Sequence, residues 1–289
     1  MAFTAVFNFR DLGGYQGLQG RTVRWRRLYR SDTLSRLCDA DRQAFEALGI
    51  RTVLDLRRPY EIERDGRCPQ WNGLVWHNID PNHPEWDPAL YDETAGPARF
   101  LADRYRDLAE TGREGLARAL AVIADADAAP TVVHCVAGKD RTGVLAALTL
   151  ALLGVSDVDI ATEYAMTQQA EAKFTAWLRA NHPERADRTP PVFYTVTPPE
   201  AMLLFLTELR ERHGSVERYV LDSGLERHQI AALREHLLTE APGSGSPSPA
   251  RTRSPAAPLP RATGPGAPSR TGRPHVPAGC PQETDAASR

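Results

Sequence analysis

The sequence predicts an α/β fold in which a central, mostly parallel β-sheet is flanked by helices. Two observations indicate this fold. Short runs rich in β-branched residues alternate with longer helical patterns, and one such run leads directly into a seven-residue loop and an uncharged helix. The chain has 289 residues, enough for one large or two small domains. The number of domains therefore depends on where the globular part ends.

Four short, strand-like runs predict strands, and those at 51–56 and 131–135 are rich in β-branched residues. They lie at residues 28–31, 51–56, 74–79 and 131–135. The last of them follows Pro130 and reads TVVHC. We expect these strands to form the parallel part of the sheet.

Capping signals and apolar periodicity predict the helices. Ser156 suits an N-cap, proline at 198 suits the start of a helix, and Gly154 and Gly214 suit helix ends. The residues after Gly154 are expected to be helical almost throughout. The predicted helices span 39–48, 97–110, 114–126, 144–154, 156–180, 197–214, 216–221 and 226–238.

The segment 241–289 differs in composition from the rest of the chain. It holds 11 of the 23 prolines and no aromatic residue. Such a segment buries too little apolar surface to offset its backbone entropy, so we predict a disordered tail. Residues 1–240 then form a single globular domain of ordinary size.

The formal net charge of −2 combines two parts of opposite sign. The tail carries 6 Arg against 2 acidic residues, which leaves 29 basic and 35 acidic residues in 1–240. A domain with this balance lacks the basic surface of a nucleic-acid-binding protein, so no nucleic-acid partner is expected. The partner of the weakly basic tail stays open. The longest apolar run, 144–155, is too short to span a membrane, so we expect no integral membrane segment.

The N-terminus lacks the basic and apolar regions of a signal peptide, which predicts a cytoplasmic address with leaderless export left open. The four cysteines form no CxxC pair and predict neither a disulfide framework nor a zinc site. Cys38 and Cys68 are interpreted as buried small residues. We expect no metal and no cofactor.

The stretch VVHCVAGKDRTG, at 132–143, carries the most information about chemistry. Cys135 and Arg141 are separated by five residues, the CX5R spacing. A loop of this length can surround one phosphate with inward-pointing N–H groups, and the helix that follows adds its positive N-terminus. The spacing therefore predicts a phosphate-binding loop made of Val136, Ala137, Gly138, Lys139, Asp140 and Arg141.

Cys135 is the candidate nucleophile of this loop. Inward amides, a helix N-terminus and neighbouring cations favour a thiolate. The planar guanidinium of Arg141 can hold two phosphate oxygens at once. Only Lys139 and Lys173 are lysines among 35 basic residues, which indicates that a point charge is needed at 139. We expect His134 and Thr142 to support the loop, His134 as a buried orienting residue.

HCVAGKDRTG resembles the signature of the cysteine-dependent protein tyrosine phosphatase superfamily. More narrowly, it is similar to the bacterial branch that includes the mycobacterial phosphatase B and the Listeria lipid phosphatase. The stretches 8–15, 28–34, 53–61 and 213–225 resemble other blocks of that family. The resemblance covers about residues 7–238 and excludes the tail.

The resemblance implies a role for each matching residue. Cys135 would attack phosphorus, and Arg141 would bind the phosphoryl oxygens. Asp140 would act as catalytic acid or base, and Lys139 is associated with phosphoinositide headgroups in this branch. Arg57 would support the site from the neighbouring strand end.

The predicted function is metal-independent hydrolysis of phosphomonoesters through a phosphocysteine intermediate. Phosphotyrosine proteins are the first candidate substrates, and phosphoserine or phosphothreonine proteins and phosphoinositides stay open. Three alternatives remain: a catalytically silent phosphate-binding module, a sulfurtransferase and an arsenate reductase. A Walker A loop is excluded because position 133 is Val and Asp140 follows Lys139.

Two further points stay open. Asp140 is the first candidate for the general acid, and Asp80, Glu85 and Asp87 are rivals in the segment DPNHPEWDP. The helical part 157–213 is either ordinary core or the helical lid of the resembling family, for which 185–193 would be the hinge.

Overall fold

A five-stranded sheet with strand order β1-β2-β5-β3-β4 forms the centre of the structure. The computed structural model describes residues 3–71, 73–181 and 190–240. β2, β5, β3 and β4 are parallel, and the two-residue β1 is antiparallel to β2. The predicted α/β class with a mostly parallel sheet is therefore confirmed. The strands are β1 (Arg10–Asp11), β2 (Leu28–Ser31), β3 (Thr52–Asp55), β4 (Val75–Asn78) and β5 (Thr131–His134).

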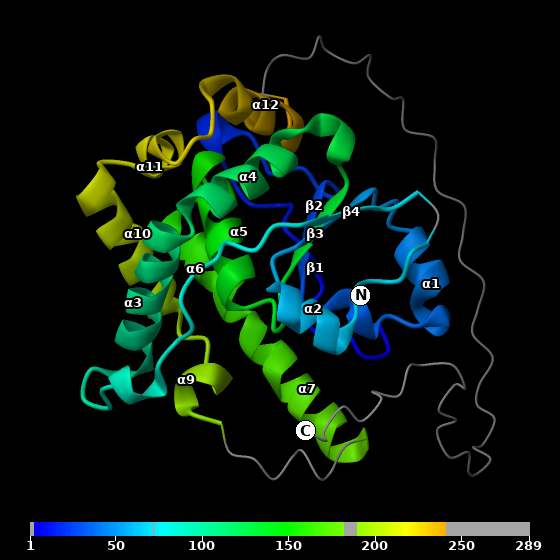
Figure 1. The fold of residues 1–289 in the computed structure, drawn as a ribbon. Coiled ribbons are helices and arrows are strands. Elements are labelled where there is room, and N and C mark those ends of the chain that lie inside the picture. Colours follow the sequence, from blue (N-terminus) through cyan, green and yellow to red (C-terminus); the bar gives the residue numbers. More distant parts are fainter. Residues whose placement is uncertain (1–2, 72, 182–189, 241–289) are drawn as a thin grey trace, which may run out of the picture.

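Helices cover both faces of the sheet. α1 lies on one side, and a larger group that includes α3 to α6 and α10 to α12 lies on the other (Figure 1). α7 extends away from the body of the molecule. The helices are α1 (Asp39–Glu46), α2 (Pro59–Asp65), α3 (Gly96–Thr111), α4 (Arg113–Ala124), α5 (Asp140–Leu152), α6 (Asp157–Ala165), α7 (Thr167–Asn181), α9 (Val192–Thr195), α10 (Pro199–His213), α11 (Val216–Asp222) and α12 (Arg227–Leu237).

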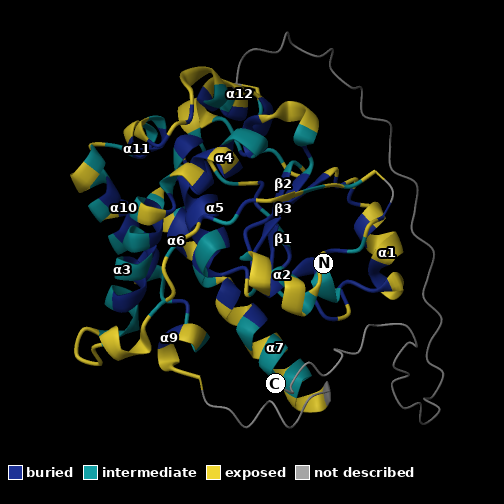
Figure 2. Cartoon of the chain, viewed as in Figure 1, coloured by how far each residue is buried: buried dark blue, intermediate teal, exposed yellow. Residues whose placement is uncertain are grey.

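The three inner strands are buried at every residue, as expected for a sheet covered on both faces. Successive residues of a strand point to opposite faces, and the two apolar cores follow that alternation. Val53 and Val132 pack into the smaller core with α1, whereas Leu54 and Val133 pack into the larger core. Figure 2 shows the inner strands and much of α5 as buried.

α5 lies in the larger helical layer and is buried on nearly all sides. Its sequence from Val144 onward carries no charge, so burial on all sides costs little. Because α5 directly follows β5, its N-terminus lies at the carboxyl end of the parallel strands. Ligand sites of open α/β sheets lie at that edge.

Some boundaries differ from the prediction. The helix expected at 156–180 is two helices, α6 and α7, because the N–H of Met166 contacts the carbonyls of both Thr162 and Glu163 and tightens the last turn of α6. β1, α2 and α9 were not predicted, since each is too short to show a periodic pattern. In the described part of the chain no helix is long and apolar enough to cross a membrane. The predicted tail, 241–289, and most of the predicted hinge lie outside the described residues.

Candidate active site

The loop between β5 and α5 forms the base of the site. β5 ends at His134, and Cys135 follows with 3% of its surface exposed. α5 begins at Asp140, so Arg141 lies in its first turn. Cys135 borders the larger apolar core and contributes to raising the pKa of the Arg141 guanidinium. The sequence-predicted loop therefore brings the thiol, the arginine and a helix N-terminus together.

Carbonyl groups of the loop are held from outside. The N–H of Thr33 donates to the carbonyl of Val136 at 2.9 Å, and Nδ2 of Asn8 donates to the carbonyls of Ala137 and Gly138 at 2.9 and 3.1 Å. Since the C=O and N–H of one peptide point in opposite directions, outward carbonyls turn amides inward. Across the described chain, the N–H groups of residues 136–139 have no protein acceptor. The loop can therefore offer these donors to an anion.

A buried ion pair supports the same part of the loop. Arg30 donates from Nη2 to the carbonyl of Gly138 at 2.5 Å and from Nη1 to Glu163 at 2.6 Å. Arg10 donates to the other oxygen of Glu163, also at 2.6 Å. Burial opposes the ionised form of Glu163, but the charges of Arg30 and Arg10 outweigh it and lower the pKa of the carboxyl. Asn8 and Arg30 lie in the stretches 8–15 and 28–34, whose sequences did not predict this role.

Gly138 occupies a position that a side chain cannot share. Its φ is +64°, in the left-handed region. A Cβ atom there would lie 2.2 Å from the carbonyl oxygen of Ser31, which is far inside contact distance. The loop thus needs glycine both for its backbone conformation and for its close approach to β2.

Glu61, on α2, fixes the side chain of Arg141. Nη1 and Nη2 of Arg141 donate to the two oxygens of Glu61 at 2.6 and 2.9 Å, and Nη1 also donates to the carbonyl of Leu56. Burial alone would lower the pKa of Arg141, but the Glu61 hydrogen bonds and the charges of Cys135 and Glu61 raise it. Within the described residues the Nε–H group and one Nη2 hydrogen keep no protein acceptor, so the guanidinium can hold two phosphoryl oxygens.

Asp140 is held by a pair of buried tyrosines. The hydroxyl of Tyr105, on α3, donates to Oδ1 of Asp140 at 2.8 Å and lies 2.5 Å from the hydroxyl of Tyr164, on α6. Burial raises the pKa of both phenols well above its usual value, and the charge of Asp140 adds to the effect. Both tyrosines therefore stay protonated at neutral pH. Neither tyrosine could be predicted from a local sequence pattern, because they lie 35 and 24 residues from Asp140.

Lys139 points toward the helical part and away from open solvent. Its Nζ donates to the carbonyl of Phe193, on α9, at 2.6 Å, and lies 3.9 Å from Oδ1 of Asp140. Burial lowers the pKa of the ammonium, although the charges of Asp140 and Glu171 act against it. The lysine thus links the phosphate loop to α9.

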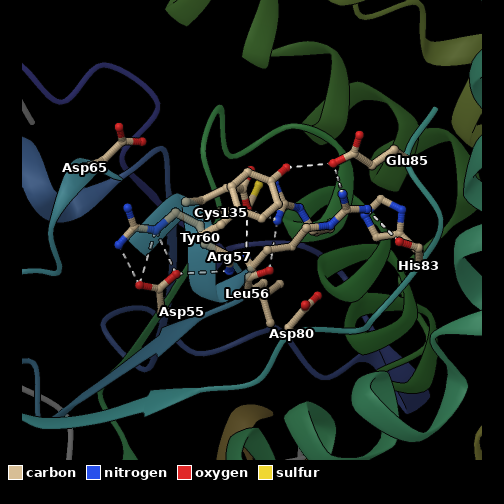
Figure 3. Close-up of polar contacts among 12 residues, drawn as sticks. Asp55, Leu56, Arg57, Tyr60, Asp65, Asp80, His83, Glu85 and Cys135 are labelled. Carbon is tan, nitrogen blue, oxygen red and sulfur yellow. Dashed lines mark hydrogen bonds and ion pairs between the residues drawn. The ribbon is translucent and has the colours of Figure 1, made fainter. Parts of the chain in front are cut away.

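The three supporting residues differ in their surroundings. His134 is fully buried, with Nε2 3.5 Å from Asp55, and burial lowers the pKa of its imidazole. Arg57 extends to Asp55 at 2.8 Å and not toward Cys135, so its support is indirect (Figure 3). The hydroxyl of Thr142 is buried without a partner among the described residues.

The rival acids have partners of their own. Glu85 accepts hydrogen bonds from Arg58 and Tyr60 (Figure 3), and Asp87 caps the 3₁₀ helix Pro88–Leu90 through the N–H of Ala89. Asp80 accepts the N–H of Asn82 in the same segment. These bonds give the loop 80–90 its shape.

His83, in this segment, was not singled out by the sequence. Burial lowers the pKa of its imidazole, and the charges of Arg141 and Arg58 lower it further, so the segment passes close to Arg141. His83 is therefore neutral at pH 7. The Pro-rich segment DPNHPEWDP thus forms a wall of the site, where the ring of Trp86 packs against those of Tyr105 and Tyr194, and it supplies no charged histidine.

A cavity of about 100 Å³ lies beside the loop, between Lys139 and the helical part. α7 contributes Glu171 and Phe174, α9 contributes Tyr194, and the segment after α9 contributes Thr197. Lys139, Val136 and Ala137 form its loop side. The helical part therefore lies against the phosphate loop.

The other described cysteines are separate from this chemistry. Cys38 and Cys68 are both buried, as expected, and Cys68 has a free thiol whereas Cys38 does not. Burial and the charge of Asp55 raise the pKa of Cys68 to about 11, so it is protonated at neutral pH. Among the described side chains, no group of three His, Cys, Asp or Glu is placed to hold a metal ion.

Comparisons with known proteins agree with the site. The model of a family described as "Tyrosine phosphatase family" matches residues 1–239. A Cupriavidus necator protein, named provisionally as a tyrosine-protein phosphatase, is 34% identical over 186 residues, which cover 60% of this chain and 65% of that protein. The triple specificity protein phosphatase PtpB of Mycobacterium tuberculosis is 28% identical over 81% of this chain and 97% of its own.

A tyrosine-protein phosphatase of Nostoc commune is 27% identical over 72% of this chain and 73% of its own length. The matching segment of this chain spans just under two thirds of the Cupriavidus protein, but the family model covers nearly all of the described residues. The resemblance stated from the loop sequence is confirmed. The chain belongs to the tyrosine phosphatase family.

Proposed function

We propose that this chain is a metal-independent phosphomonoester hydrolase that works through a phosphocysteine on Cys135. One observation carries the proposal. The loop that begins at Cys135 carries amides without an acceptor among the described residues, and it leads into the N-terminus of α5 and the guanidinium of Arg141, which Glu61 fixes. Fixed donors of this kind stabilise the charge that spreads over phosphoryl oxygens in the transition state.

In the first step the thiolate of Cys135 attacks phosphorus. The S–P bond forms as the bond from phosphorus to the leaving oxygen breaks, and that oxygen takes a proton from the carboxylic acid of Asp140. Arg141 and the loop N–H groups bind the three equatorial oxygens during this transfer.

In the second step water attacks the phosphocysteine. The carboxylate of Asp140 takes a proton from the water as its oxygen bonds to phosphorus, and the S–P bond breaks to release phosphate and the thiolate. Asp140 thereby returns to its acid form for the next turnover.

Asp140 is favoured over its rivals by its neighbours. It lies five residues after the nucleophile in the loop itself, and Tyr105 holds its carboxyl group. Glu85 and Asp87 are exposed and already engaged by donors of the 58–90 region. Asp80 lies in the wall formed by the Pro-rich segment.

Phosphotyrosine proteins are the first proposed substrates, with phosphoserine or phosphothreonine proteins and phosphoinositides as further candidates. The names of the relatives support a protein phosphatase, and one relative is named for triple specificity. The half-exposed ring of Tyr194 lies near enough to Asp140 for the aspartate charge to contribute to raising the pKa of its phenol, after burial. An aromatic ring at this place suits an aromatic phosphate ester.

We also propose that α7 and α9 act as a lid. Their residues border the cavity beside the loop, and Lys139 ties α9 to the loop through the Phe193 carbonyl. Closing such an element excludes water from the reacting centre. The cytoplasmic address and the disordered tail stay predictions.

The test is hydrolysis of p-nitrophenyl phosphate in excess chelator, with the Cys135→Ser and Arg141→Ala variants. We expect chelator-resistant turnover, no turnover for Cys135→Ser, and a loss of at least 10²- to 10³-fold for Arg141→Ala. A ³²P-labelled covalent adduct should appear in the wild type and not in Cys135→Ser.

Turnover that survives Cys135→Ser would refute the scheme. Phosphate binding without turnover would favour a silent module, and transfer of sulfur from thiosulfate or reduction of arsenate would favour the other two alternatives. A panel of phosphotyrosine peptide, phosphoserine peptide and phosphoinositide then ranks the substrates.

A further inference from the structure

We propose that Tyr105 is a positioning residue for Asp140: its hydroxyl holds Oδ1, so that the catalytic proton is carried by Oδ2. The proposal rests on the proposed function, in which Asp140 is the acid and base. It adds a residue from a distant helix that touches neither the substrate nor the reacting atoms.

The packing of three helices brings the groups together. α3, which carries Tyr105, and α6, which carries Tyr164, both pack against α5, whose first residue is Asp140. Tyr105 is 0% exposed and Tyr164 is 1% exposed. The two hydroxyls are 2.5 Å apart, and Tyr105 lies 2.8 Å from Oδ1 of Asp140.

The direction of each hydrogen bond follows from the number of protons. A carboxylate can only accept, so the single hydroxyl proton of Tyr105 goes to Asp140. The oxygen of Tyr105 then accepts the proton of Tyr164. The chain of donation therefore runs from Tyr164 to Tyr105 to Oδ1.

This chain determines which oxygen of Asp140 carries a proton. Protonated on Oδ2, the carboxyl keeps Oδ1 as an acceptor for Tyr105. If the carboxyl of Asp140 were protonated on Oδ1, it would lose the hydrogen bond from Tyr105. Its proton would then lie toward the ammonium of Lys139, which is 3.9 Å from Oδ1. In the first step the proton leaves Oδ2 for the leaving oxygen, and in the second step Oδ2 takes a proton from water.

Tyr105 keeps its own proton throughout. Burial raises the pKa of both phenols well above its usual value, so at neutral pH they are hydrogen-bond donors and not proton carriers. The other titratable and charged groups that interact with Asp140 come from the loop, from α5 and from α9: Lys139, Arg141 and Tyr194.

The burial of the Tyr105 and Tyr164 hydroxyls also indicates that they do more than fill space in the core. A buried hydroxyl costs free energy unless it is hydrogen-bonded, and phenylalanine would fill the same space without that cost. Trp86 and Phe205 pack on the ring of Tyr105, so its surroundings are otherwise aromatic. Among the described residues, each hydroxyl is hydrogen-bonded only within the chain that ends on Asp140.

The test measures kcat and KM of Tyr105→Phe with aryl phosphates whose leaving groups differ in basicity. A good leaving group such as 2,4-dinitrophenolate departs without a proton, whereas a phenolate needs one. We expect kcat to fall about tenfold for phenyl phosphate and less than about twofold for 2,4-dinitrophenyl phosphate, with KM unchanged. Tyr164→Phe should show the same pattern more weakly.

The matched control is Tyr219→Phe. Tyr219 is as buried, but its hydroxyl donates to the carbonyl of Ala109 at 2.6 Å and not to the site. It should change thermal stability without changing the dependence on the leaving group. Thermal unfolding of each variant establishes that it is folded, and Tyr164→Phe serves if Tyr105→Phe is not.

Three outcomes would overturn the inference. A uniform fall of kcat across leaving groups, or a rise in KM alone, would make Tyr105 a structural residue. If kcat depends more steeply on the basicity of the leaving group in Asp140→Asn than in the wild type, but not in Tyr105→Phe, the positioning role is refuted. The proposed function is then unaffected. A normal dependence in Asp140→Asn would instead remove Asp140 as the acid, and with it the premise.

Discussion

The carboxylate of Glu61, in the first turn of α2, holds the guanidinium of Arg141 through two hydrogen bonds of 2.6 and 2.9 Å. The two side chains are about 90% buried, with 10% and 11% of their surfaces exposed. A planar guanidinium paired on one edge has only its other edge to offer. Glu61 thus sets the plane in which Arg141 can meet a phosphoryl group.

We expect Glu61→Gln to lower kcat on p-nitrophenyl phosphate about 10- to 100-fold. The amide keeps one acceptor but presents an N–H₂ group to the guanidinium, and a charge-assisted pair contributes about 1.5–3 kcal/mol. The control is Glu63→Gln, an exposed residue of the same helix, which should leave kcat unchanged. Equal activity of the two variants would show that Arg141 needs no partner.

Gly138→Ala should nearly abolish activity, because the new Cβ would lie 2.2 Å from the carbonyl oxygen of Ser31 and push the loop from β2. Gly49→Ala is the matched control, since Gly49 has a similar φ of +66° but open space around it. We expect it to lose about 1 kcal/mol of stability and no activity. Vanadate affinity and thermal unfolding of both variants separate the two effects. Normal vanadate binding by Gly138→Ala would contradict the proposed tight loop.

The sequence predicted the features that depend on neighbours along the chain. The strands 28–31 and 131–135 were predicted from runs of residues, and the structure has them within one residue. The helix predicted at 144–154 instead begins four residues earlier, at Asp140, so the loop after β5 ends before Arg141. These signals are local, because β-branched runs and the strand-to-helix loop each lie within a few residues.

The residues that hold the loop could not be predicted in this way. Glu61 lies 80 residues from Arg141, and Arg30 lies 108 from Gly138. Their partnership depends on how the sheet orders β2, β5 and β3. One signal was available for Glu61: Pro59 at the first helical position predicts a helix start that places Glu61 in its first turn.

Replacing the candidate acids one at a time should identify the proton donor. We expect Asp140→Asn to lower kcat by about 10²-fold for phenyl phosphate and far less for good leaving groups. Asp80→Asn and Asp87→Asn serve as comparisons, and both should keep the wild-type dependence. Single-turnover rates across a series of leaving groups provide the measurement. A steeper dependence in Asp80→Asn than in Asp140→Asn would assign the acid to the Pro-rich segment.

Stability should fall in acid partly through Glu163. Its pKa is lowered in the folded protein by Arg30 and Arg10, against the effect of burial, from an ordinary value of 4.5. The ion pairs therefore stabilise the fold above about pH 4.5 and lose that contribution as pH falls through the lower folded value. Glu163→Gln should be less stable than the wild type at pH 7, because two arginines lose their partner. Between pH 5 and pH 3 its free energy of unfolding should fall by less than that of the wild type.

Denaturant unfolding across that pH range measures the difference. Glu46→Gln is the control, since it removes an exposed ion pair with Arg42 and should leave the pH dependence nearly unchanged. The same loss of stability in acid for wild type and Glu163→Gln would show that this pair does not titrate on unfolding.

Lys139→Met should lower the turnover of a phosphoinositide about tenfold and that of a phosphotyrosine peptide only about twofold. The ammonium has three donors, of which two are directed at the carbonyls of Phe193, at 2.6 Å, and Tyr194, at 3.5 Å, so a second phosphate can take the third without breaking the tie to α9. Methionine keeps the length of the side chain and removes the charge. kcat/KM for both substrates gives the ratio.

Lys173→Met is the control, because Lys173 is the other lysine of the chain, is exposed, and lies on α7. It should change neither rate. If Lys139→Met raises kcat/KM equally for both substrates, the hydrogen bond from Lys139 to Phe193 limits access to the site and does not select substrates. Without that bond α9 could move away and admit any phosphate ester. If the peptide rate falls as far as the lipid rate, the ammonium stabilises the transferred phosphoryl group itself, which every substrate shares.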